Sequence, residues 1–124
     1  MNTSMRPGIA HATLLTPDLA ATCGAYEAQL SMSLDSRGAL AAEDATVLDL
    51  ADLAGAPMAW LVNSEGTPIL RVVEDPAAVP GEPMFRHGWL SLEVLVGDID
   101  GLAAGLGAPF TVLGPPANLE LSDA

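Results

Sequence analysis

Residues 8–30, GIAHATLLTPDLAATCGAYEAQL, decide the fold of this chain. Residues 8–15 combine apolar and β-branched side chains and predict a strand. Thr16 is a favoured N-cap residue, Pro17 fits a first helical turn where a missing N–H costs nothing, and Asp18 suits the positive end of a helix dipole. The stretch therefore predicts a strand that leads directly into a helix capped by Thr16.

The predicted helix carries one continuous apolar face. Its members follow one another at spacings of 4, 3 and 4: Leu19, Cys23, Tyr26 and Leu30. The same order of strand, aspartate and helix returns later, because residues 90–96 predict a strand and residues 97–107 an aspartate and a helix. With an offset of 80 residues Asp18 superposes on Asp98, which indicates a weak internal repeat.

Four further elements are predicted between the two copies. Residues 31–40 favour a strand interrupted by a glycine, and residues 43–53 favour a helix. The apolar residues of that helix lie at helical spacing: Val47, Leu50 and Leu53. Residues 58–63 and 68–74 are apolar runs joined by a short connection with a glycine, which is typical of a hairpin. Residues 75–87 hold three prolines and a glycine and indicate a linker.

Composition excludes several classes of protein. The chain has 124 residues, half of them hydrophobic, which suffices for one packed domain. The formal net charge of −12 disfavours nucleic acid and anionic membranes as partners. No apolar run reaches the roughly 18 residues of a membrane helix, and no signal peptide is recognised, so a cytoplasmic protein is expected. The single Cys23 forms no internal disulfide, in agreement with a reducing compartment, and is expected to be an inert core residue.

The N-terminal stretch resembles the vicinal oxygen chelate superfamily of glyoxalases, bleomycin-resistance proteins and extradiol dioxygenases. The matching residues are those of its helix signature: Asp18, Leu19, Thr22, Tyr26 and Leu30. His11 stands where metal-dependent members have their first ligand histidine. The resemblance implies an α+β fold of βαβββ modules, whose curved mixed sheets enclose a pocket for a small organic molecule.

The resemblance also implies where the modules lie. The first occupies residues 1–78, a linker residues 79–87, and a partial second module residues 88–124. After the helix of the second module, the sequence can form one or two strands, in residues 109–113 and 118–121, whereas a complete module needs three. We therefore expect a homodimer that supplies the missing strands, or a longer polypeptide of which this chain is a part.

The residues at the family's metal-ligand positions depart from the pattern. The carboxylate expected in the middle of residues 69–72 is replaced by Arg71, a cation, and the second module's histidine by Ser91. Glu74 is nearby but three residues further along the strand, hence on its opposite face, and His87 lies four residues before Ser91. We therefore predict neither the usual metal site nor another cofactor.

Five residues are candidates for a ligand-binding pocket: His11, Trp60, Arg71, Ser91 and Glu93. Arg71 would bind a carboxylate or phosphate in a two-pronged contact, and Trp60 would form an apolar wall. Four of them have a simpler alternative. His11 would be a hydrogen-bonded strand histidine, and Arg71 a surface residue paired with an acidic side chain. Trp60 would fill the core, and Glu93 would pair with Arg71 or point to water.

The sequence thus predicts a glyoxalase-like protein that binds a small organic molecule, with an anion as one option, in a concave sheet pocket and without the usual metal. Two alternatives stay open. One is a metal-dependent lyase or dioxygenase of the same superfamily, with an ion held by His11 and either Glu74 or His87. The other is a structural or interaction module that has kept the fold and lost the chemistry.

Overall fold

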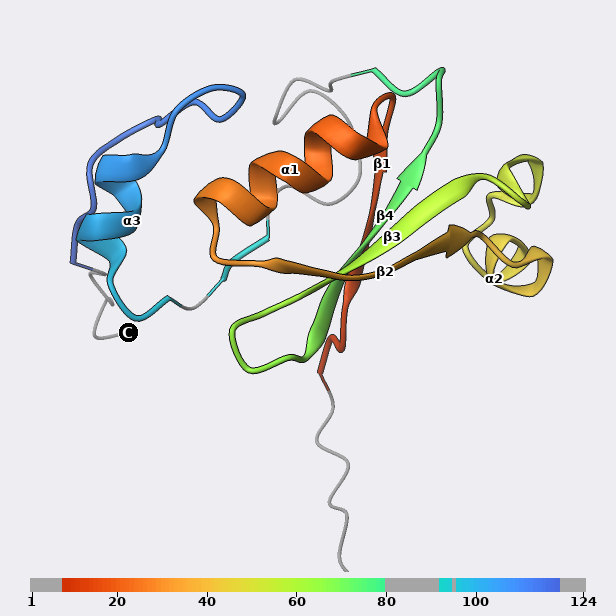
Figure 1. Ribbon diagram of the computed structural model, residues 1–124, viewed down its shortest axis with the longest axis horizontal. Coiled ribbons are helices and arrows are strands. Elements are labelled where there is room, and N and C mark those ends of the chain that lie inside the picture. Colours follow the sequence, from red (N-terminus) through yellow and green to blue (C-terminus); the bar gives the residue numbers. More distant parts are fainter. Residues whose placement is uncertain (1–7, 80–91, 95, 119–124) are drawn as a thin grey trace, which may run out of the picture. The chain divides into compact units, whose positions relative to one another are not determined.

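A computed structural model describes residues 8–79, 92–94 and 96–118 (Figure 1). The chain divides into two compact units, Met1–Pro80 and Gly81–Ala124. Each unit is described by itself. Within the described residues no helix has the length and apolar character needed to cross a membrane.

The first unit is built on one mixed four-stranded sheet. Its strands are β1 (Ala12–Thr16), β2 (Ser33–Ala39), β3 (Pro57–Val62) and β4 (Pro68–Glu74), in the order β1-β4-β3-β2. β1 runs parallel to β4, and the other two pairs are antiparallel. The expected α+β fold with a βαβββ module is confirmed, including the strand over residues 31–40, which continues through its glycine.

The hairpin between β3 and β4 is formed as predicted. Gly66 has φ of 80°, a conformation that glycine adopts without a steric penalty. The side-chain Oδ1 of Asn63 accepts hydrogen bonds from the backbone N–H groups of Glu65 and Thr67, each at 3.0 Å. These bonds satisfy donors that a turn leaves without strand partners, and they fix the register of β4 on β3.

Helix α1 (Leu19–Gln29) follows β1, but the prediction that Thr16 caps it was wrong. Asp18 is the N-cap, and its carboxylate accepts a hydrogen bond from the N–H of Ala21 at 3.0 Å. Thr16 is instead the last residue of β1, where it is buried and its hydroxyl lies 2.6 Å from that of Thr22. Pro17 therefore lies before the helix. Aspartate caps a helix better than threonine, and Asp18 stands two residues beyond Thr16.

The single helix predicted over residues 43–53 is also corrected. The structure has a short α2 (Ala42–Val47) and a 3-10 turn η1 (Ala51–Leu53), separated by Asp49 with φ of 57°. Val47, expected on the buried face, is 85% exposed. Ala45 and Leu48 make the core contacts of this segment in its place, and Leu53 of η1 packs against the same cluster.

Apolar side chains form a separate cluster on each face of the sheet. The larger cluster lies under α1 and contains Leu19, Cys23, Met32, Ala59, Leu61, Leu70 and Val72. The smaller one lies under α2 and η1 and contains Leu40, Ala45 and Val73. β4 is the best covered strand, since it lies inside the sheet and contributes to both clusters.

The second unit contains helix α3 (Ile99–Gly105). Its N-cap is Asp98, whose carboxylate accepts from the N–H of Gly101 at 2.9 Å. Asp98 thus repeats the role of Asp18, with a similar extended backbone and a bond to the N–H three residues on. The predicted correspondence of the two aspartates is confirmed at the level of local geometry.

The strands predicted for the second unit are not found where the structure describes them. Residues 92–94 and 96 are outside any strand, as are residues 109–113, while residues 90, 91, 95 and 119–121 lie outside the described residues. Leu92, Val94 and Val112 are about half exposed. A strand needs hydrogen-bonding neighbours, and an apolar pattern by itself supplies none.

Candidate functional site

The pairing of the strands brings four side chains, a guanidinium, an indole and two hydroxyls, into one row across the sheet. Arg71 of β4 is the direct partner of Thr13 on β1 and of Trp60 on β3, and Trp60 is paired with Ser36 on β2. Directly paired residues point to the same face of a sheet. Thr13, Arg71, Trp60 and Ser36 therefore cross all four strands on the face opposite α1.

Arg71 is buried, with 7% of its surface exposed. Its Nε donates a hydrogen bond to the Thr13 hydroxyl at 3.0 Å. Its guanidinium carbon lies 5.2 Å from the centre of the Trp60 ring, within the range of a cation–π interaction. The guanidinium is thus held from two sides in one orientation.

Asp44 of α2 provides the one carboxylate that forms an ion pair with Arg71 among the described residues. Its Oδ2 lies 3.7 Å from Nη1 of Arg71, and its side chain is 55% exposed. Hydrogen bonds between a guanidinium and a carboxylate measure about 2.7–2.9 Å, so this ion pair is loose. Among the described residues this is the only ion pair of Nη1, and neither Nη1 nor Nη2 makes a hydrogen bond.

His11 completes the group from the segment before β1. Its ring lies 4.9 Å from the Trp60 ring at an interplanar angle of 83°, an edge-to-face arrangement. His11 is exposed and Trp60 is half-buried. We name the five residues His11, Thr13, Asp44, Trp60 and Arg71 the Arg71 cluster.

The structure therefore brings together three of the five predicted site residues, His11, Trp60 and Arg71. Ser91 lies outside the described residues. Glu93 belongs to the second unit, is exposed and is outside any strand, so its predicted place on a strand face is not found. Strand alternation alone would place Ile69 on the Arg71 face, but Ile69 packs against the cluster under α1. The pairing of β3 with β4 shifts at this point, between Leu61 and Val62 of β3.

Thr13, Ser36 and Asp44 were not predicted as site residues. Thr13 and Ser36 become neighbours of Arg71 and Trp60 only through the pairing of strands far apart in the sequence. Asp44 is one of sixteen acidic residues, and nothing next to it in the sequence distinguishes it. Only a predicted register for β1 and β4 would have indicated Thr13.

Glu74 has a structural role at the other end of β1. Its Oε2 accepts a hydrogen bond from the N–H of Leu19 at 3.0 Å, in the first turn of α1. Glu74 pairs with Thr16, whereas His11 precedes Ala12, which pairs with Leu70. Five strand residues separate the two positions, about 16 Å, so His11 and Glu74 cannot bind one ion.

No group of three or more histidine, cysteine, aspartate or glutamate side chains suited to a metal ion occurs among the described residues. The Arg71 cluster holds two residues of types that bind metals, His11 and Asp44, which is fewer than the three protein ligands of a usual site, and its guanidinium repels a divalent cation. The described part of the Arg71 cluster therefore does not fit the ion that the sequence resemblance implies, while His87 lies outside the described residues.

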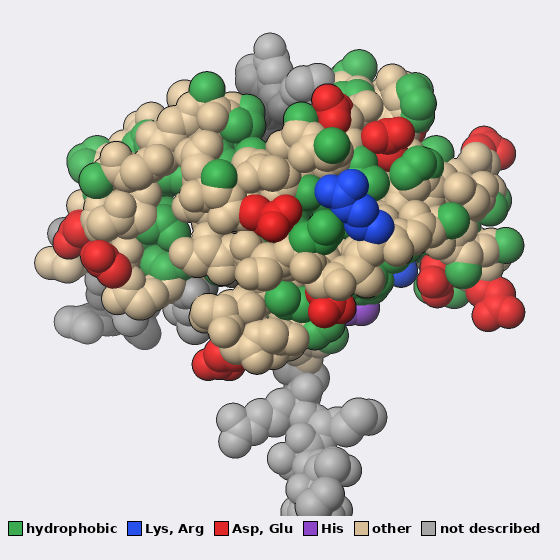
Figure 2. Space-filling model, in the orientation of Figure 1, with side chains coloured by type: hydrophobic (Ala, Val, Ile, Leu, Met, Phe, Trp, Pro, Cys, Tyr) green, Lys and Arg blue, Asp and Glu red, His purple; other side chains and the backbone are tan. Residues whose placement is uncertain are grey.

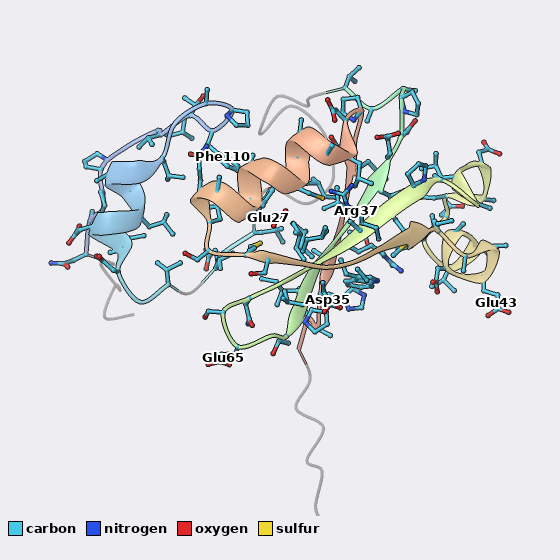
Figure 3. The ribbon with its side chains drawn as sticks, viewed as in Figure 1. Glu27, Asp35, Arg37, Glu43, Glu65 and Phe110 are labelled. Atoms are coloured by element: carbon cyan, nitrogen blue, oxygen red, sulfur yellow. The ribbon has the colours of Figure 1, made fainter. Side chains whose placement is uncertain are left out.

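Two other titratable groups of the first unit, Cys23 and Tyr26, belong to or pack against its core. Burial raises the pKa of the Cys23 thiol, an effect that Arg37 partly offsets, and burial also raises the pKa of Tyr26. Arg37 pairs with Ala59 and so points to the α1 side of β2, where Figure 3 shows it. Figure 2 shows acidic side chains spread over the visible face, against few basic ones.

Comparisons with known proteins give one structural likeness. No family model and no curated protein matches the sequence. A crystal structure of a glyoxalase family protein from Bacillus cereus is similar, with a TM-score of 0.58 and 16% identity over 84% of this chain and 72% of that one. At this identity the likeness concerns the fold alone. The chain therefore has a fold like that of this glyoxalase family protein, as the resemblance of its first helix predicted.

Proposed function

We propose that this protein binds a small organic anion, with a carboxylate as its charged group, on the sheet face that carries the Arg71 cluster. The observation that supports this most is the state of the Arg71 guanidinium. It is buried and oriented, yet its two terminal nitrogens have only a loose contact to Asp44 among the described residues. Among the described residues no fully buried side-chain nitrogen lacks a hydrogen-bond partner, so the terminal nitrogens keep some exposure to solvent, from which an anion can reach them.

The surroundings of Arg71 suit an organic anion better than a hydrated inorganic one. The Trp60 ring lies beside the cation, and the His11 ring packs edge-to-face against Trp60. Binding sites for small molecules combine mainly apolar walls with a few placed polar groups. A carboxylate on the guanidinium and an apolar body along the rings would use both features.

The proposed binding needs no metal ion. The guanidinium itself supplies the positive charge, and its planar fork matches a carboxylate. EDTA is therefore expected to leave both binding and the melting temperature unchanged. Stoichiometric zinc, nickel, iron or manganese, removed by EDTA with loss of binding, would favour the metal-dependent lyase or dioxygenase over this proposal.

A thermal-shift experiment with matched ligands tests the proposal. A ligand that binds only the native state raises the melting temperature. Aromatic and aliphatic carboxylates, benzoate first, are compared with the corresponding amides, which have the same shape without the charge. We expect the carboxylates to raise the melting temperature more than their amides. Equal shifts for carboxylates and amides would refute an anion site. No shift throughout the series would refute it as well and would favour a module without chemistry.

A further inference from the structure

We propose that Asp44 acts as a built-in competitor of the ligand, so that an anion binds Arg71 by displacing the Asp44 carboxylate. This inference rests on the proposed function and adds a regulatory element to the same site. It assigns α2 a role besides covering the smaller apolar cluster.

The first argument is the limited choice of donors on the guanidinium. An arginine offers two edges to a carboxylate, one formed by Nε with a terminal nitrogen and one formed by the two terminal nitrogens. Thr13 occupies Nε at 3.0 Å. A two-pronged contact must therefore use Nη1 and Nη2 together.

The second argument is that Asp44 lies at one of these two nitrogens. Its Oδ2 is 3.7 Å from Nη1, too far for a good hydrogen bond and near enough to obstruct a second carboxylate. Two carboxylates at one nitrogen repel each other. An incoming anion must therefore move Asp44 away before both terminal nitrogens can donate to it.

The third argument is that Asp44 can leave at little cost. Its side chain is 55% exposed, so a change of rotamer turns the carboxylate into water. The backbone of α2 need not move, because Ala45 and Leu48 rather than Asp44 pack into the smaller apolar cluster. Exposed ion pairs contribute little to stability, and this one is already long.

The neighbouring Glu43 supplies a matched control. Glu43 and Asp44 are both in the first turn of α2, where a carboxylate favours the helix dipole. Figure 3 shows Glu43 at the outer side of α2, away from the sheet. Glu43→Gln and Asp44→Asn remove the same charge from the same turn, and only Asp44 contacts Arg71.

The experiment is a calorimetric titration with benzoate at low salt. It compares the wild-type protein with Asp44→Asn, Asp44→Ser and Glu43→Gln, each checked for an intact cooperative melting transition. We expect both Asp44 variants to bind benzoate roughly two- to five-fold more tightly than Glu43→Gln, which corresponds to the energy of an exposed ion pair. Glu43→Gln should match the wild type closely.

The outcomes separate this inference from the proposed function. If the wild type binds benzoate through Arg71 and the Asp44 variants bind no more tightly than Glu43→Gln, the competitor role is wrong and the anion site stands. Weaker binding by the Asp44 variants would make Asp44 a part of the site and overturn the inference as well. If neither the wild type nor any variant binds, the proposed function fails, and the inference fails with it.

Discussion

The two faces of the four-stranded sheet use alternate residues of the same strands for different purposes. On β4, Leu70 and Val72 point toward α1 and belong to the larger apolar cluster, whereas Arg71 between them points the other way. α1 covers one face with apolar contacts. On the other face α2 and η1 cover Val73, and the row beside it carries the guanidinium, a tryptophan and a hydroxyl. Alternation thus lets one strand stabilise the fold and present a charge.

The largest expected effect lies on the α1 face. Leu61 is fully buried there, and Leu61→Ala removes apolar contacts and leaves a cavity. We expect a loss of about 2–5 kcal/mol in the free energy of unfolding, measured by urea denaturation. Val47→Ala, at an exposed position, is the control and should change it by less than about 0.5 kcal/mol. A small loss for Leu61→Ala would mean that this face is not the main core.

A smaller effect is expected where α1 begins. Asp18→Ala removes the carboxylate that accepts from the N–H of Ala21, which should lower stability by about 1 kcal/mol. Asp18→Asn is the control, because an asparagine oxygen caps a helix about as well. Equal losses in the two variants, by thermal or urea unfolding, would show that charge rather than the cap bond matters.

The smallest effect is a loss of stability at alkaline pH, and it comes from two groups on the α1 face. Burial raises the folded-state pKa of Cys23 and of Tyr26 above their usual values of 9.0 and 10.0. Above pH 9 the unfolded chain therefore loses these protons more readily than the folded chain, and stability falls as pH rises. Melting temperatures from pH 7 to 11 should show this fall, and Cys23→Ala with Tyr26→Phe should reduce it. An unchanged slope in the double variant would contradict the assignment.

The sequence predicted the elements of the first unit well, because its signals are local. The hairpin follows from two apolar runs and a glycine, and the face of α1 from the spacing of Leu19, Cys23 and Tyr26. The cap and the break between α2 and η1 were missed. Each depends on a choice between neighbouring residues of similar propensity, which tertiary packing decides.

The site was predictable only in part, for a related reason. Arg71 stood out as a cation in an apolar strand, and the resemblance indicated His11. Thr13 and Asp44 become its partners through contacts 58 and 27 residues apart in sequence (71 − 13 and 71 − 44). Local patterns do not report on such contacts.

In the second unit the sequence pattern predicts the start of the helix but not its burial. Asp98 caps α3 as Asp18 caps α1. The residue that follows Asp98, Ile99, is 53% exposed, whereas Leu19, which follows Asp18, is 8% exposed. Cap geometry requires only the neighbouring residues, whereas burial requires a sheet. The repeat in sequence therefore produces the same helix start in both units and a covered helix face only in the first.

The central claim is that the face opposite α1 carries an anion site centred on Arg71. The most direct test measures benzoate affinity for Arg71→Ala and for Arg37→Ala, which removes an arginine from the α1 side of the same sheet. Both variants lose one positive charge, so the general effect of net charge is the same. We predict that Arg71→Ala weakens binding by about 1.5–3 kcal/mol, the usual value of a hydrogen bond to a charged group, and that Arg37→Ala changes it little. Equal weakening in two folded variants would contradict the claim, because binding would then follow the net charge of the protein and not the site.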